Sequence, residues 1–435
     1  MRKKKNAFTL IELLAVIVIL AVILVIAIPR ILDVIETSKK DSFKNSAQLI
    51  ADSAEKKKAS DKLLDKDEEI TCKDVAKIND EDYASCKITF DSDGIAKVSI
   101  TGKGKFDGLK ITNGTKENAE VKEITKPTYG MKAVEYISNL YDYDGEGLKK
   151  DNTPDENIRY YGSNPNNYVR FNNELWRIIG VFGDNVKLVR SESLGKLSWD
   201  SSKSSINDGY GVNEWSQADL QVYLNKMYYG GTTVTCYGGT NNTTTTCPTN
   251  KLNAESKSLI DNHTWNTGAP NWIALSDSTT ESYDTVEFYK AERGSENGKK
   301  CQSGRTYCND TVTRTTEWNG YIGLPYVTDW AYASGEDDCN TMIDKSSTKK
   351  CKNNNWMHYG NGYGDKTWYL SPYLQPDTCV TNASNSVWCV SGVGGVYDDF
   401  AANPLSVFPT IYLKSNVIID GGTGSVNDPY TLDAK

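Results

Sequence analysis

The sequence predicts a mixed α+β protein. A long N-terminal helix packs on a small antiparallel sheet, and a larger, disulfide-stapled α+β domain with long loops follows. Residues 8–60 keep one helical pattern of apolar residues. Short β-branched and aromatic segments separated by turn sequences come next. The chain holds 26 Tyr and 34 Gly but only 12 Pro, a composition typical of exposed β-structure with many turns.

The helix begins with a basic segment and an apolar span. Residues 1–7 carry one Arg and three Lys, and residues 8–28 contain a single charged residue, Glu12. At about 1.5 Å per residue the apolar span covers about 31 Å, which is one bilayer core. The basic flank stays on the cytoplasmic side by the positive-inside rule. We therefore expect a single membrane-spanning helix at residues 8–28, with its N-terminus inside the cell.

Residues 29–60 continue the helix with only one apolar face. The apolar positions recur at mostly helical spacing and are Ile31, Ile35, Phe43, Ala47, Ile50 and Ala54. Pro29 lies inside this pattern, so a kink or local loosening is expected there. The sequence thus predicts one helix of about 50 residues, apolar all round in its first half and amphipathic in its second.

Glu12 is the residue in the apolar span that requires a partner. A carboxylate at this depth costs on the order of 2.5 to 3.5 kcal/mol on insertion scales. Once the basic segment is removed, its own chain offers no nearby cation. A free N-terminal amine on a neighbouring subunit supplies the opposite charge at the same depth. The alternative is a tolerated charge near the end of a plain anchor.

Residues 7–14 (Ala-Phe-Thr-Leu-Ile-Glu-Leu-Leu), followed by Pro29, resemble the processing motif of type IV prepilins and type II secretion pseudopilins. The resemblance implies that a prepilin peptidase cleaves between Ala7 and Phe8 and methylates the amine of Phe8. It also implies that Glu12 neutralises a neighbour's amine during assembly. Ala7 departs from the family's usual Gly, but it is an accepted small residue. The implied partners are the peptidase, other pilin or pseudopilin subunits, and the membrane before assembly.

Residues 61–127 are expected to form the small head of a pilin fold. Strands are predicted at 87–90, 96–100 and 108–111, separated by turn sequences. A three-stranded sheet of this size needs the helix to cover one of its faces. Residues 113–129 are rich in Lys, Glu and Thr and are interpreted as a linker to a C-terminal domain at 128–435.

The cysteines lie outside the first 70 residues and are even in number. Taken in chain order they form five close pairs: Cys72 with Cys86, Cys236 with Cys247, Cys301 with Cys308, Cys339 with Cys351, and Cys379 with Cys389. An even number of cysteines in an exported protein favours disulfides, although their connectivity does not follow from sequence. Metal binding is the alternative, but the chain has no C-x-x-C motif and only two histidines.

The C-terminal domain begins with a predicted β-meander. Strands are expected at 168–171, 175–182 and 186–190, joined by hairpin turns. A helix is expected at 216–229, where Ser216 and Asp219 suggest a capping box. Further strands are predicted at 319–324, 368–372 and 407–413. Strands, long loops and one or two helices make this an α+β domain.

Four stretches of this domain carry a loose resemblance that spans most of residues 165–415. They are Leu-Trp-Arg-Ile-Ile-Gly at 175–180, 220–225, Trp-Tyr-Leu-Ser-Pro at 368–372, and Phe-Pro-Thr-Ile-Tyr-Leu at 408–413. Together they resemble a bacterial domain of unknown function that is related to C-type-lectin-like and formylglycine-generating-enzyme folds. The resemblance implies a scaffold that presents loops to a ligand, although a fold does not fix a function.

Composition and motifs exclude several classes of function. The formal net charge of −8, which becomes about −12 without the basic segment, argues against a nucleic-acid partner. Two histidines and no Gly-x-Ser-x-Gly elbow argue against a nucleophilic enzyme. No cofactor is expected. Calcium remains an alternative at the carboxylate clusters 142–146, 336–338 and 398–399 and at the Gln-Pro-Asp tripeptide 375–377.

Three functional hypotheses follow. The first is a minor or tip pilin that assembles through its helix and presents a binding domain to a glycan or protein, because exposed Tyr and Trp in stapled loops suit such contacts. The second is a pseudopilin of a type II secretion or DNA-uptake system. The third is a surface-displayed enzyme in the C-terminal domain. In the first two, the chain is stored in the cytoplasmic membrane and reaches the cell surface, pilus or pseudopilus after processing.

Overall fold

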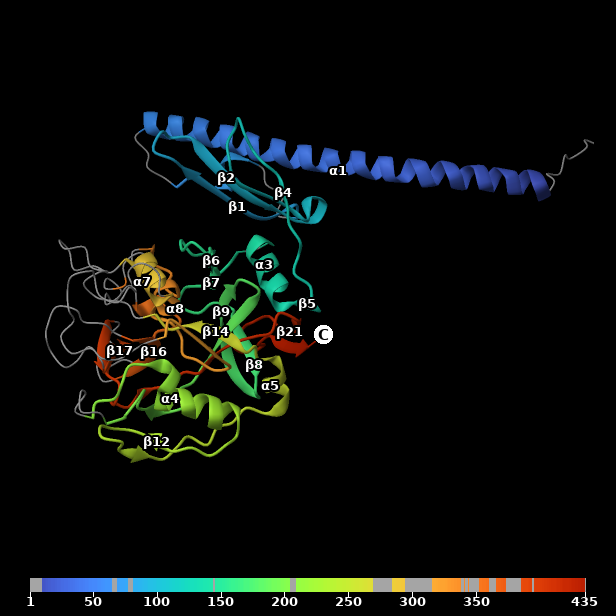
Figure 1. The fold of residues 1–435 in the computed structure, drawn as a ribbon. Coiled ribbons are helices and arrows are strands. Elements are labelled where there is room, and N and C mark those ends of the chain that lie inside the picture. Colours follow the sequence, from blue (N-terminus) through green and yellow to red (C-terminus); the bar gives the residue numbers. More distant parts are fainter. Residues whose placement is uncertain are drawn as a thin grey trace, which may run out of the picture. The chain divides into compact units, whose positions relative to one another are not determined.

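The structure is a computed structural model of the 435-residue chain. It describes residues 10–64, 69–76, 81–143, 145–203, 209–268, 284–293, 315–337, 340, 343, 352–359, 365–372, 385–392 and 395–434. Within these residues the architecture is mixed α+β, which confirms the predicted fold class. The chain divides into two compact units, residues 1–126 with 142–144 and residues 127–141 with 145–435 (Figure 1).

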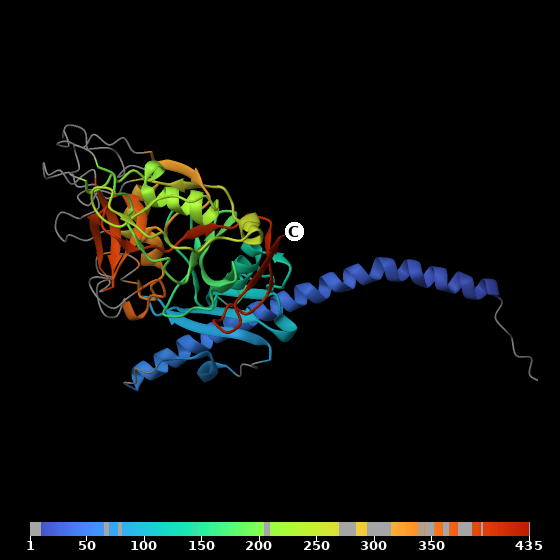
Figure 2. The same ribbon diagram turned by 90° about the horizontal axis from the view of Figure 1, so that it is seen from below.

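Helix α1 (Leu10–Leu63) is one continuous element of 54 residues. Its sequence contains no glycine, and its Ala and Leu residues have high intrinsic helix propensity. Pro29 lies inside the helix, where it removes one backbone donor. The helix continues through this position along a shallow curve (Figure 2).

The first unit contains a four-stranded antiparallel sheet in the order β1-β2-β3-β4. The strands are β1 (Tyr83–Phe90), β2 (Ala96–Gly102), β3 (Leu109–Gly114) and β4 (Lys122–Glu123). The three predicted strands are present. The fourth, β4, pairs with Leu109 and Lys110 of β3, inside the segment interpreted as a linker. That segment is therefore partly an edge of the sheet.

The sheet covers the second half of α1. Phe43, Ala47 and Ala54 are fully buried there, together with Val98 of β2 and Ile111 of β3. These small and aromatic residues let the helix lie close to the sheet. The predicted apolar face begins to be covered only at Phe43, because Ile31 and Ile35, which belong to the same stripe, are 56% and 58% exposed.

The larger unit is built around a six-stranded sheet in the order β20-β10-β9-β7-β6, with β8 also paired to β9. Its strands are β6 (Leu148–Lys150), β7 (Ile158–Tyr160), β8 (Tyr168–Phe171), β9 (Glu174–Phe182), β10 (Asn185–Arg190) and β20 (Thr410–Tyr412). The predicted meander β8-β9-β10 is present. Its first turn places Asn172 and Asn173 at φ of 56° and 59°, the left-handed conformation that a two-residue hairpin requires.

Further strands complete the larger unit. A five-stranded sheet comprises β11 (Lys196–Leu197), β19 (Leu405–Ser406), β16 (Lys366–Pro372), β17 (Ser386–Ser391) and β18 (Val396–Phe400). A three-stranded sheet joins β5 (Met131–Lys132), β21 (Val417–Gly421) and β22 (Thr431–Ala434). Two antiparallel two-stranded sheets are β12 (Cys236–Tyr237) with β13 (Thr244–Thr245) and β14 (His263–Asn266) with β15 (Glu317–Gly320).

The helices of the larger unit are short. They are α3 (Ala133–Tyr143), the 3-10 turn η2 (Trp215–Gln217), α4 (Asp219–Val222), the π-helical segment η3 (Tyr223–Tyr229), α5 (Ala254–Leu259), α7 (Thr285–Glu292) and α8 (Val327–Tyr332). The helix predicted at 216–229 is thus divided among three elements. Its start is capped by Glu214, which accepts from the backbone of Gln217, so the capping box expected at Ser216 is not formed.

Tryptophan dominates the core of the larger unit. The fully buried indoles are those of Trp176, Trp199, Trp215, Trp265, Trp330, Trp368 and Trp388. The indole N–H groups of Trp265 and Trp368 donate to the backbone carbonyls of Gly320 and Leu197, both at 2.9 Å, whereas those of Trp176, Trp199, Trp215 and Trp330 have no hydrogen-bond acceptor among the described residues. These seven tryptophans therefore belong to the core and are not exposed contacts for a ligand.

Two of the predicted disulfides are present, Cys72–Cys86 and Cys236–Cys247. Cys301, Cys308, Cys339, Cys351 and Cys379 lie outside the described residues. Cys389 is a free thiol in β17, so the expected bond to Cys379 is not formed in this structure. The Cys389 side chain is 0% exposed within the hydrophobic core, and this burial raises the pKa of its thiol.

Candidate functional site

The first half of α1 exposes its apolar side chains among the residues that the structure describes. Its exposed side chains are Leu10, Ile11, Leu13, Leu14, Val16, Ile17, Val18, Ile19, Leu20, Val22, Ile23, Leu24, Val25 and Ile28. Among the described residues α1 is the one helix long and apolar enough to cross a membrane. A contiguous apolar surface of this size marks a contact with lipid or with other subunits.

The processing residues lie at the start of this helix. Ala7 and Phe8 lie outside the described residues, and Glu12 lies near the beginning of α1 with a side chain that is likewise outside the description. Glu12 is four positions after Phe8, which corresponds to about 6 Å along a helix, or roughly one turn. A neighbouring helix displaced by about one turn brings its Phe8 amine level with Glu12. The assembly role of Glu12 stays an expectation from the motif.

Polar contacts fix the second half of α1 to the sheet. Lys39 donates to the carbonyl of Asp107 at 2.6 Å, and Lys40 forms an ion pair with Glu123 of β4. The hydrogen bonds that Lys40 donates to the carboxylates of Glu123 and Glu36 raise the pKa of Lys40. Further along the helix, Lys58 stacks on the ring of Phe90 with its Nζ 3.9 Å from the ring centroid. The sheet is therefore tied to α1 from residue 39 to residue 58.

Between this first half and the attached segment, α1 exposes a short apolar turn beyond Pro29. Ile31, Leu32, Val34 and Ile35 are all more than half exposed. The exposed apolar surface of α1 therefore runs from residue 10 to residue 35. At about 1.5 Å per residue that is about 39 Å, longer than the roughly 30 Å hydrocarbon core of a bilayer. The excess suits contact with other helices better than contact with lipid alone.

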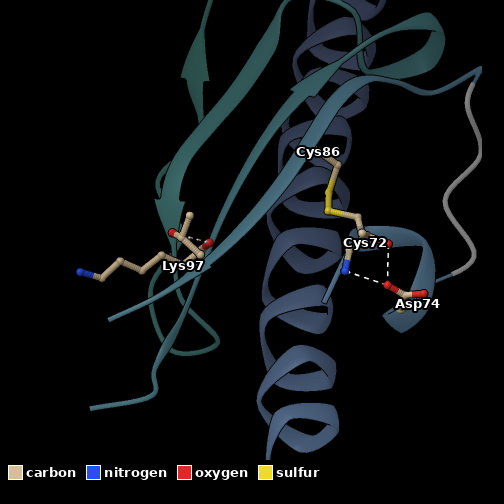
Figure 3. Close-up of a disulfide and its surroundings, with 6 residues drawn as sticks. Cys72, Asp74, Cys86 and Lys97 are labelled. Atoms are coloured by element: carbon tan, nitrogen blue, oxygen red, sulfur yellow. Dashed lines mark hydrogen bonds between the residues drawn. A yellow bond between two sulfur atoms is a disulfide. The ribbon is translucent and has the colours of Figure 1, made fainter. Parts of the chain in front are cut away.

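The disulfide Cys72–Cys86 joins the short helix α2 (Cys72–Val75) to strand β1, beside α1 (Figure 3). Asp74 closes the start of α2 by accepting from the backbone N–H of Thr71 at 2.8 Å and from its hydroxyl at 2.6 Å. The hydrogen bond from the Thr71 hydroxyl is the main reason that the pKa of Asp74 is lowered. The bridge and the cap hold residues 71–76 against the edge of the sheet.

The described residues of the carboxylate clusters considered for calcium do not come together in one site. Asp399 forms an ion pair of 2.7 Å with Lys366 and accepts a hydrogen bond from the side-chain amide of Asn403. Asp144 and Asp338 lie outside the described residues, as does the tripeptide 375–377. Over the part of the chain that the structure describes, no group of three or more His, Cys, Asp or Glu is placed to hold a metal ion.

The larger unit contains a buried ionic network that sequence reasoning missed. Arg159 of β7 contacts Asp151 at 2.5 Å and Asp329 at 2.8 Å, and Asp329 also contacts Lys187 of β10 at 2.5 Å. All four side chains are at most 1% exposed. Glu292, 0% exposed, accepts from the hydroxyl and N–H of Thr328 beside this network, and burial raises the pKa of its carboxyl to about 7.

The comparisons with known proteins bear on the N-terminus. Residues 2–28 match the family model of the prokaryotic N-terminal methylation motif, which supports the type IV prepilin-type motif inferred from residues 7–14. No curated protein and no solved structure matches the chain. The resemblance expected for residues 165–415 therefore has no support from these comparisons. The chain carries a type IV pilin- or pseudopilin-like N-terminus, which implies processing by a prepilin peptidase and assembly with other pilin subunits.

Proposed function

We propose that this chain is a minor or tip subunit of a type IV pilus, which assembles through α1 and presents residues 128–435 as a binding domain. One observation carries the proposal: over the described part of the chain, the contacts that tie α1 to its sheet begin at residue 39, while residues 10–35 expose apolar side chains. A surface of this kind is stable in a membrane or in a bundle of like helices. The methylation motif at residues 2–28 is the signal for the processing that transfers such a helix from the membrane into the filament.

The size of the larger unit supports a low-abundance position. A compact unit of about 300 residues has a radius of gyration of roughly 19 Å. Repeating such a unit at every subunit of a thin filament is sterically demanding. A subunit at the tip, or one inserted rarely, avoids that crowding and displays the domain outward.

The proposed life cycle follows from the same features. Before assembly, the apolar part of α1 spans the cytoplasmic membrane with residues 1–7 on the inner side. The prepilin peptidase removes these residues and methylates Phe8. The Phe8 amine of one subunit then pairs with Glu12 of another, so that the carboxylate is neutralised as α1 leaves the membrane. The binding domain acts by recognition of a glycan or protein rather than by turnover.

Glu12→Gln tests the assembly step. The variant keeps the shape of the side chain and removes the charge, so we expect normal processing at Phe8 but loss from filaments sheared off the cell. N-terminal peptide mass and immunoblots of the sheared and membrane fractions measure the two outcomes. Glu36→Gln is the matched control: it changes an exposed carboxylate of the same helix that pairs with Lys40, and it should leave filament incorporation unchanged. Equal incorporation of both variants contradicts the role of Glu12.

Immunogold labelling of the larger unit tests the position in the filament. We expect sparse or terminal label, and even decoration along whole filaments contradicts the minor-subunit role. A glycan array probed with the detergent-purified full chain tests recognition, where binding without turnover is expected. Deletion of the gene tests the class of machinery: loss of protein export or DNA uptake with adhesion intact replaces the pilus proposal by a pseudopilus.

A further inference from the structure

Lys187 and Asp329 form an ion pair that is sealed inside the larger unit. The Nζ of Lys187, on β10, lies 2.5 Å from Oδ2 of Asp329, in the first turn of α8, and the two side chains are 0% and 1% exposed. The residues are 142 positions apart in the chain. An amine and a carboxyl group are thus held in contact where bulk water has no access.

Aromatic rings surround the amine. The Nζ of Lys187 lies 4.1 Å from the ring centroid of Tyr326, 5.3 Å from those of Phe182 and Tyr412, and 5.7 Å from that of Trp265. The rings attract a cation but replace few of the hydrogen bonds that water gives an ammonium group. Burial accordingly lowers the pKa of Lys187 to about 8, whereas Lys187 and Arg159 hold the pKa of Asp329 below its ordinary value. The neutral, nucleophilic amine therefore arises by proton transfer within the pair.

Arg159 and a backbone amide hold the carboxyl group of Asp329 in one orientation. Nη1 of Arg159 donates to Oδ1 at 2.8 Å, and the N–H of Tyr326 donates to Oδ2 at 2.9 Å. Asp151 in turn fixes Arg159 from the other side at 2.5 Å. The guanidinium therefore faces the oxygen on which negative charge develops when a nucleophile attacks the carboxyl carbon. A fixed donor at that position stabilises a tetrahedral intermediate.

We propose that Lys187 and Asp329 become joined by an intramolecular isopeptide bond between Nζ and Cγ. The ammonium passes a proton to Oδ2 along their hydrogen bond, and the resulting amine attacks Cγ. The C–Oδ2 bond then breaks, and the oxygen leaves as water with a second proton from the nitrogen. Ammonium and carboxylate are converted to amide and water, with no oxidant, reductant or outside proton. Oδ1 remains as the amide oxygen on Arg159.

The charges of the network favour this product. Two buried ions each cost several kcal/mol in desolvation, and that cost is relieved when they become one neutral amide. The reaction removes one cation and one anion, so Arg159 and Asp151 remain as a balanced pair. The released water departs from the site. The aromatic rings that enclose the site then keep water away and protect the amide from hydrolysis. The bond ties β10 to α8 covalently.

Mass spectrometry of the reduced full chain, purified in detergent, tests the proposal. We expect a mass about 18 Da, one water, below that of the sequence once the N-terminal peptide has fixed the cleavage and methylation state. Proteolysis should yield a branched peptide that contains both Lys187 and Asp329. In Lys187→Arg, which keeps the cation but cannot form the amide, the two peptides should be separate and the mass loss absent.

The chain provides an internal control in the same digest. Lys366 and Asp399 form an ion pair of similar length, 2.7 Å, but their side chains are 16% and 14% exposed. Their peptides should stay unlinked, because water stabilises both ions there. Separate, unmodified Lys187 and Asp329 peptides from the folded wild-type chain overturn the proposal. That measurement needs no variant, so a folding defect in Lys187→Arg does not obscure the result.

Discussion

Glu55 and Lys116 form an ion pair of 2.7 Å that joins helix α1 to the loop after strand β3. The same carboxylate accepts a hydrogen bond from the backbone N–H of Ala96 at 3.2 Å through its other oxygen. One helical side chain therefore holds the beginning of β2 and the end of β3. This contact differs from a surface ion pair because the Glu55 side chain is only 17% exposed.

Two substitutions of Glu55 measure separately the ion pair with Lys116 and the hydrogen bond from Ala96. Glu55→Gln keeps an acceptor for Ala96 and loses the ion pair, whose value we expect to be at most about 1 kcal/mol because Lys116 is 43% exposed. Glu55→Ala also leaves the N–H of the buried Ala96 without its acceptor and should cost about 1–3 kcal/mol. Thermal unfolding of the full chain in detergent measures both. Equal destabilisation by the two variants contradicts this division.

Phe43 is expected to be the main apolar contact between α1 and its sheet. Its side chain is 0% exposed and packs on the rings of Phe106 and Tyr83, with centroids 5.2 and 6.1 Å away. Phe43→Ala should destabilise the first unit by about 3–5 kcal/mol, as measured by denaturant unfolding. Leu49→Ala on the same helix, where the side chain is 66% exposed, should change stability by no more than about 0.5 kcal/mol. Similar losses for both argue against packing at Phe43.

The disulfide Cys72–Cys86 should stabilise the edge of the first unit. It closes a loop of 14 residues, so its loss should cost about 3 kcal/mol. Replacing both cysteines by Ser should speed amide hydrogen exchange in β1 and α2. The same change at Cys236 and Cys247, in the other unit, is the control and should leave exchange in β1 unaltered. Unchanged exchange in β1 after removal of Cys72–Cys86 contradicts the stabilising role.

Glu292 should make the larger unit less stable as pH rises. Burial raises the pKa of its carboxyl from 4.5 to about 7, so the folded state binds more protons than the unfolded state between these values. Stability from this group is therefore greatest below pH 4.5, falls as pH rises to about 7, and then levels off. The total loss is about 3 kcal/mol at roughly 1.4 kcal/mol per pH unit.

Glu292→Gln tests that dependence. The variant keeps an acceptor for Thr328 and cannot ionise, so it should be more stable than wild type at pH 8 and lose the slope between pH 4.5 and 7. Chemical denaturation at several pH values measures the difference. Glu287→Gln, at a partly exposed position on the same helix, should leave the slope unchanged. A wild-type slope of opposite sign contradicts the assignment to Glu292.

The sequence predicted best what local patterns encode. The apolar span and the helical spacing of Phe43 to Ala54 are visible in a short window, as are the meander turns at Asn172 and Asn173. β4 was missed because its two residues, Lys and Glu, have no strand character. They pair only because β3 offers a free edge. The late start of packing on α1 was missed because spacing shows that a face is apolar but not what covers it.

The ionic network of the larger unit was hidden for a different reason. Arg159, Lys187 and Asp329 are charged, and charged residues are usually exposed. Asp151 is only 8 positions from Arg159, but Asp329 is 170 positions from Arg159 and 142 from Lys187, so no local window contains the contacts that complete the network. For Cys389, by contrast, a local pattern was misleading. Its closeness to Cys379 in the sequence predicted a disulfide, whereas its position in β17 places the free thiol inside the core. Pairing across the chain is set by topology.

The three-stranded sheet β5-β21-β22 brings the two ends of the larger unit together, because Met131 pairs with Ile419 and Val417 pairs with Ala434. The first strand of the larger unit and its last two described strands therefore belong to one sheet. The contacts that hold α1 to its own sheet lie in the other unit, so a change inside the larger unit leaves them unaltered.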